Sequence, residues 1–131
     1  MQQFSGVNHA LRGVSFVDED RGIAVGGGRI FWTSNGGTWT YQSTWENQVN
    51  FLGVSLVDAN TAFAVGERID TVPGHGAIVR TTDGGATWTL QYSGIDLALT
   101  GVSMVDAITG TTVGGAAPYR GIILRTETGG E

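Results

Sequence analysis

A six-residue motif occurs three times along the chain, and this repetition constrains the fold more than any other feature of the sequence. The motif is Gly-Val-Ser, an apolar residue, Val and Asp, and it occupies residues 13–18, 53–58 and 101–106, at offsets of 40 and 48 residues. A period of about 20–50 residues is typical of repeat proteins, in which each unit packs against its neighbours. Three copies of one structural unit are therefore expected.

Further short apolar runs follow each copy of the motif in the same order. They are residues 22–26, 62–66 and 111–114, then 29–33, 77–81 and 122–126, then 38–42 and 87–91. The runs are rich in Val, Ile, Thr and aromatic residues and are separated by Gly, Asp and Asn, which is typical of strands. Four short strands per repeat is the pattern of a β-propeller blade. The sequence predicts an all-β fold of four-stranded antiparallel blades, three per chain, at about residues 13–42, 53–92 and 101–131.

Composition excludes several classes of protein. The 131 residues carry 7 basic and 12 acidic side chains, a formal net charge of −5, which argues against non-specific nucleic-acid binding. The chain has no cysteine, so it has neither disulfides nor thiolate metal sites. No apolar run reaches the roughly 18 residues of a membrane span, and residues 1–5 do not resemble a signal peptide. We expect a soluble chain without cofactor or metal, in a compartment that the sequence does not specify.

An aspartate closes each copy of the motif, at Asp18, Asp58 and Asp106. A short carboxylate at the start of a turn can accept a hydrogen bond from a backbone N–H two residues later. We therefore expect these side chains to hold turns, and an acid–base role is the less favoured alternative.

Residues 81–88 match the pattern Ser/Thr-x-Asp-x-Gly-x-Thr-Trp at every fixed position. On this motif and the phased repeats, the chain resembles the Asp-box (bacterial neuraminidase repeat) propellers. Its segments Val-Ser-Phe-Val-Asp and Arg-Thr-Thr-Asp-Gly-Gly-Ala-Thr-Trp look most like the photosystem II stability/assembly factor branch. The resemblance implies that the box is structural, with its carboxylate tying the turn and its Trp packed on the blade. The residues to which it gives this role are Thr81, Asp83, Gly85, Thr87 and Trp88, with Asn35 and Trp39 in the first unit.

The other two units depart from this pattern. The first has Asn35 in place of the Asp and is one residue shorter before Thr38, and the third has Thr128 at the Asp position. A single carboxylate per loop is a poor site for calcium, which takes about six to eight oxygen ligands.

Three blades fall short of the about four to eight that propellers use. Residues 4–13 align with residues 92–101 at an offset of 88, so residues 1–5 correspond to an outer strand. Two copies joined head to tail would form a six-bladed homodimer, in which residues 1–5 of one chain pair with residues 122–126 of the other. The alternative is that the chain is a fragment of a longer propeller or forms another assembly.

The loops between the second and third strands, and those leading into the next unit, differ between repeats. In an up-and-down blade both sets project from the same face, and variable loops on a rigid scaffold commonly bind ligands. The candidate binding residues are Trp45, Glu46, Arg68, Asp70, His75, Tyr119 and Arg120, with Asn8 and His9 from the first unit. The alternative is that these are ordinary solvated loops.

A sialidase-like enzyme would need an arginine triad and a paired Tyr and Glu. Arg80 and Arg125 occupy equivalent positions, but Trp32 stands there in the first unit. No tyrosine has a Glu partner at a recognisable spacing. The favoured function is a non-catalytic scaffold that binds itself and a protein or carbohydrate partner, without nucleic acid or membrane insertion. The alternative is a sialidase-like glycan-binding or glycoside hydrolase propeller.

Overall fold

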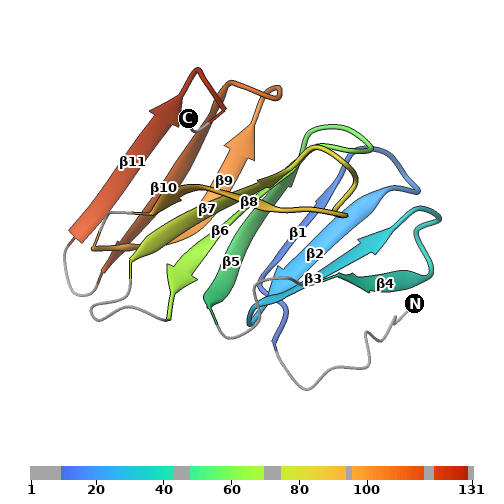
Figure 1. The fold of residues 1–131 in the computed structure, drawn as a ribbon, viewed down its shortest axis with the longest axis horizontal. Helices are drawn as coiled ribbons and strands as arrows, with labels where there is room; N and C mark the ends of the chain where they lie inside the picture. The colour runs from blue at the N-terminus through green and yellow to red at the C-terminus, as the bar shows by residue number, and fades with distance from the viewer. Residues whose placement is uncertain (1–9, 43–47, 70–74, 94–95, 117–119, 130–131) are drawn as a thin grey trace.

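The computed structural model describes residues 10–42, 48–69, 75–93, 96–116 and 120–129, which form eleven strands in three antiparallel sheets (Figure 1). Within these ranges there is no helix that could cross a membrane. The strands are β1 (Gly13–Phe16), β2 (Gly22–Gly26), β3 (Arg29–Thr33), β4 (Trp39–Gln42), β5 (Val49–Leu56), β6 (Ala62–Arg68), β7 (Gly76–Thr81), β8 (Thr89–Ser93), β9 (Ala98–Met104), β10 (Gly110–Ala116) and β11 (Arg120–Thr126).

Each sheet is a meander in which strands adjacent in sequence are paired in space. The strand orders are β1-β2-β3-β4, β5-β6-β7-β8 and β9-β10-β11, and we call these sheets blades 1, 2 and 3. The all-β prediction is confirmed, and β2 and β3 coincide with the runs expected at residues 22–26 and 29–33.

The first strands of blades 2 and 3 begin earlier than the repeated motif suggests. β5 starts at Val49, and the register between β5 and β6 shifts between Phe51 and Gly53. Val49 and Phe51 are 1% and 0% exposed, so these residues at the start of β5 extend the core. The extra residue at the register shift lets the side chains after it again point alternately into the core. A similar shift occurs in blade 3 between Val113 and Gly114.

The core lies between the stacked faces of the blades. Alternate residues of β2 and β3, among them Ile23, Ile30 and Trp32, pack against blade 2 residues that include Val79 and Trp88. Because side chains of a strand alternate between its two faces, the other face of blade 2 is left for blade 3. Each blade therefore depends on its neighbours for burial.

Blade 3 contains three strands in the part of the chain that the structure describes, so β11 is an edge strand. Residues 1–5 lie outside the described residues. The proposed pairing of residues 1–5 with residues 122–126 thus stays a prediction.

Candidate functional site

The meander topology gives the stacked blades two different edges. β2, β6 and β10 run in the same direction and end at the lower edge in Figure 1. We call this the loop edge, because it holds the variable connections β2–β3, β6–β7 and β10–β11. The opposite edge, which holds the repeated β1–β2 and β3–β4 turns and their counterparts, is the turn edge.

Three aspartates of the turn edge make the same hydrogen bonds in successive blades. Asp18 Oδ1 accepts the N–H groups of Asp20 and Arg21, both at 2.8 Å. Asp58 and Asp106 accept the equivalent pairs at 2.7–2.9 Å. These bonds, above all those from the residue two positions later, lower the pKa of each carboxyl. The predicted turn role of the three aspartates is confirmed.

The turn at residues 81–88 is organised around Asp83. Its carboxylate accepts hydrogen bonds from the Thr87 hydroxyl at 2.5 Å, the Thr87 N–H at 2.9 Å and the Thr81 hydroxyl at 2.8 Å. These bonds, with the Thr87 hydroxyl the strongest contributor, lower the pKa of Asp83 to about 2. Gly85 has a φ of +92°, and Trp88 is 9% exposed.

The corresponding turn of blade 1 uses an amide in place of the carboxylate. Asn35 Oδ1 accepts the N–H groups of Gly37 at 2.9 Å and Thr38 at 2.8 Å. The half-buried Trp39 makes an edge contact with Phe16, with ring centroids 5.8 Å apart. The polar side chains of these two turns are thus engaged in holding their own backbones.

On the loop edge, hydrogen bonds bring three connections of blade 2 together. Arg68 N–H donates to His75 O at 2.6 Å across the β6–β7 connection, and Ile69 N–H donates to Gln48 O at 2.8 Å, just before β5. His75 Nε2 lies 3.2 Å from Asp96 Oδ1, in the connection between β8 and β9. The two variable loop sets therefore do project from the same edge.

The candidate binding residues can be placed in part. Arg68 and His75 are half-buried and adjacent, while Arg120 is exposed at the start of β11 in the neighbouring blade. Asp96 was missed as a site residue, because its sequence position carries no signal apart from lying in a variable loop. The remaining candidates, Trp45, Glu46, Asp70 and Tyr119, with Asn8 and His9, lie outside the described residues.

Arginines and carboxylates are unevenly distributed between the edges among the described residues. The loop edge holds four of the seven arginines, Arg12, Arg29, Arg68 and Arg120, and two of the described carboxylates, Glu67 and Asp96, while Arg21, Arg80 and Arg125 lie toward the turn edge. The turn edge holds most of the acidic residues, namely Asp18, Glu19, Asp20, Asp58, Asp83, Asp106 and Glu127. The loop edge is the more suitable surface for an anionic partner.

The arginine that the enzyme hypothesis would use is placed elsewhere. The Arg80 guanidinium lies 5.5 Å from the centre of the Phe63 ring, on the face of blade 2 that meets blade 3. In the described ranges, no three His, Asp or Glu side chains are grouped as metal ligands.

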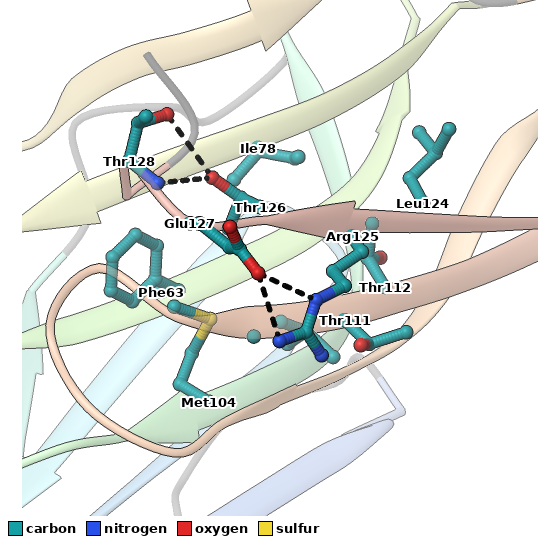
Figure 2. A pocket seen from close by; sticks show the side chains of 12 residues that line it. Phe63, Ile78, Met104, Thr111, Thr112, Leu124, Arg125, Thr126, Glu127 and Thr128 are labelled. Carbon is teal, nitrogen blue, oxygen red and sulfur yellow. Dashed lines mark hydrogen bonds and ion pairs between the residues drawn. The ribbon is translucent and has the colours of Figure 1, made fainter.

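A cavity of about 310 Å³ lies between blades 2 and 3, beside β11, and is lined by Phe63 and Ile78 of blade 2 and by Met104 and Leu124 of blade 3. Figure 2 shows Phe63, Met104 and Arg125 around it, with Arg125 joined to Glu127. In blade 2 the corresponding place is covered by β8 and by Trp88 just before it. The cavity is thus a consequence of the missing neighbour of β11 among the described strands.

No family model and no curated protein matches the chain. A solved structure of YCF48 bound to D1 peptide resembles it with a TM-score of 0.73 at 20% sequence identity. The match covers 100% of this chain and 41% of YCF48, so the chain spans about two fifths of that protein's length. The shared fold is the β-propeller. The three sheets are propeller blades.

Proposed function

We propose that the chain is a non-catalytic, protein-binding propeller scaffold whose loop edge takes an extended peptide with anionic groups. The observation that carries the proposal is the charge balance of the loop edge, where four arginines accompany only two of the described carboxylates, Glu67 and Asp96, beside loops that differ between the repeats. Arginine is enriched at binding hot spots and forms bidentate hydrogen bonds with carboxylates.

The structural neighbour supports a protein partner. YCF48 was solved with a D1 peptide, and this chain shares its fold over the full length of the chain. We further propose that the turn at residues 81–88 is an Asp-box and that Thr81, Asp83, Gly85, Thr87 and Trp88 are structural. The bonds of Asp83 within its own turn support that role.

Binding can be tested by fluorescence anisotropy with three labelled probes: the D1 peptide, an unrelated acidic peptide and a basic peptide of equal length. Arg68→Ala combined with Arg120→Ala should weaken binding of an anionic peptide about tenfold or more. Arg21→Ala is the matched control, because Arg21 is exposed on the turn edge and pairs with Asp18 at 3.8 Å. The control should bind as tightly as the unmodified chain.

Two results would contradict the proposal. One is equal binding of acidic and basic peptides. The other is a loss of binding on Arg21→Ala but not on the loop-edge changes. A glycan array and a fluorogenic sialoside assay address the alternative, and sialoside turnover would replace the scaffold proposal with a hydrolase.

A further inference from the structure

The two internal interfaces of the chain share a hydrogen bond at their inner strands. The Ser15 hydroxyl of blade 1 accepts the backbone N–H of Leu56 in blade 2 at 2.9 Å. The Ser55 hydroxyl of blade 2 accepts the N–H of Met104 in blade 3 at 3.0 Å. The serine of the repeated motif therefore joins each blade to the next.

The glycine of the same motif lets the inner strands approach closely. A methyl group added at Gly13 would lie 3.2 Å from the Gly53 Cα atom, and one added at Gly53 would lie 3.0 Å from the Gly101 Cα atom. Both distances are below normal contact, so a larger residue would push the blades apart. The glycine and the serine of the repeated motif thus both belong to the contact between the inner strands of neighbouring blades.

A second contact is repeated near the turn edge. Trp32 of blade 1 packs on the turn of blade 2, where a methyl group at Gly85 would lie 2.5 Å from Trp32 Nε1. Arg80, the equivalent residue of blade 2, packs on the turn of blade 3, with Nη1 3.2 Å from a methyl group placed at Gly129. Gly129 corresponds to Gly84, the residue before Gly85, so the two contacts are similar and not identical. In both cases a side chain of the third strand of one blade lies against the turn of the following blade.

Blade 3 presents the same elements on its outer face, which none of the described strands covers. Val113 and Ile123 are 42% and 75% exposed, while their blade 1 counterparts Val25 and Ile30 are both 0% exposed; in blade 2, Val65 is 0% exposed and Ile78 is half-buried. Ser103 is exposed at the position of Ser15 and Ser55. Arg125, at the position of Trp32 and Arg80, pairs with Glu127 at 3.2 Å, and both side chains are largely exposed. Breaking an exposed ion pair of this kind to make another contact costs little free energy.

Blade 1 presents the complementary elements on the opposite end of the stack. Val14 and Phe16 are 63% and 45% exposed, while their blade 2 counterparts Val54 and Leu56 are each 7% exposed. The N–H of Phe16 corresponds to the N–H groups that bind Ser15 and Ser55. Gly36 and the turn around it correspond to the turns that pack on Trp32 and Arg80.

We propose that these two end faces form one interface between two copies of this chain, with blade 3 of one copy docked on blade 1 of the other. In this interface Ser103 accepts the Phe16 N–H, Val113 and Ile123 cover Val14 and Phe16, and Arg125 supports the turn at Gly36. The two faces differ, so the contact is heterologous, and two such contacts related by a two-fold axis close a ring. Such a ring has six blades, within the range that propellers use.

The chain's own interfaces indicate that the occupant of each end face is a second copy of this chain. Each end face carries the elements that its counterparts use inside the chain, and exposed apolar faces of this kind mark interaction surfaces. This inference rests on the repeated contacts, and it stands or falls independently of peptide binding at the loop edge.

The test is the mass of the 131-residue chain by light scattering over a range of concentrations, with two single variants. The unmodified chain should have twice the 13.7 kDa mass of one copy. Ile123→Arg and Val14→Arg each place a charge in both contacts, so each should weaken the dimer about a hundredfold or more and give monomers. Both residues are exposed in the single chain, so circular dichroism should show that the variants keep their fold.

Mixing the two variants separates this interface from others. In a mixed pair one contact carries neither arginine and the other carries both, so the mixture should form dimers, joined through the unmodified contact, that neither variant forms alone. Ile108→Asn is the matched control, because Ile108 is 51% exposed and its counterparts are Asp20 and Asn60. This variant should remain dimeric.

Three results would overturn the proposal. The first is a monomeric unmodified chain at every concentration, which would favour further blades in a longer protein. The second is a dimer that withstands both arginine variants. The third is a dimer that only one of the two variants breaks, because that would mean contact between identical faces.

Discussion

The hydroxyl of Ser55 accepts the backbone N–H of Met104 across the boundary between blades 2 and 3, at 3.0 Å. Ser55 is 8% exposed, so this bond is largely removed from water. It links the repeated sequence motif to the stacking of the blades, because the same bond joins Ser15 to Leu56 one blade earlier.

Ser55→Ala should lower the free energy of unfolding by about 1–3 kcal/mol, because the Met104 N–H loses its acceptor in a buried setting. Ser34→Ala, at an exposed position in a turn of blade 1, should change it far less. Urea unfolding followed by tryptophan fluorescence measures both. Equal stability of the two variants would show that the bond contributes nothing.

Gly85→Ala should be strongly destabilising for two reasons. The φ of +92° disfavours any side chain, at about 1–3 kcal/mol, and the added methyl group would meet Gln42 and Trp32 of blade 1. Gly121→Ala is the control, because a methyl group there would have no atom within 4 Å. The difference in melting temperature between the two variants tests this, and a stable Gly85→Ala protein would contradict the packing of this turn on blade 1.

Trp88→Ala should cost about 3–5 kcal/mol of folding free energy, because Trp88 is 9% exposed and belongs to the core between blades 1 and 2. Trp39→Ala, at the equivalent but half-buried position, should cost less. Chemical unfolding of the two variants shows which substitution lowers the free energy of unfolding more. A reversed order would mean that Trp39 has a covering partner in solution.

Stability should fall in acid. Asp83 has a pKa of about 2 in the folded chain, below its usual 3.8. A depressed carboxyl pKa stabilises the fold above pH 3.8, and that contribution is lost as the pH falls from 3.8 towards 2. Asp83→Asn removes this titration and keeps an acceptor oxygen, as Asn35 does in blade 1. Melting temperatures from pH 5 to about 2 should therefore fall less steeply in the variant, and an unchanged slope would contradict the assignment.

The sequence predicted the blades because their strands are short and repeat in phase. β2 and β3 match the predicted runs, and Asp18, Asp58 and Asp106 bind the backbone as expected. The early starts of β5 and β9 were not predicted, since they depend on an irregularity in pairing that leaves no simple residue signature.

The candidate site was predicted only in part. Variable loops indicated the loop edge, but the contact of His75 with Asp96 joins two loops that are far apart in the sequence. The concentration of carboxylates on the turn edge could not be predicted from net charge, because it depends on which end of each strand a residue occupies. The hydrogen bonds that Ser15 and Ser55 make to the next blade could not be predicted either, because the repeated motif is equally typical of an ordinary strand.

Amide hydrogen exchange at Met104, followed by NMR, tests most directly whether the three repeats form consecutive interlocked blades. Leu56 and Met104 should both be protected in the unmodified chain, because each donates to a serine hydroxyl of the preceding blade. In Ser55→Ala, protection should fall about tenfold or more at Met104 and remain at Leu56. Rapid exchange at both amides in the unmodified chain, or no change at Met104 in the variant, would contradict the account.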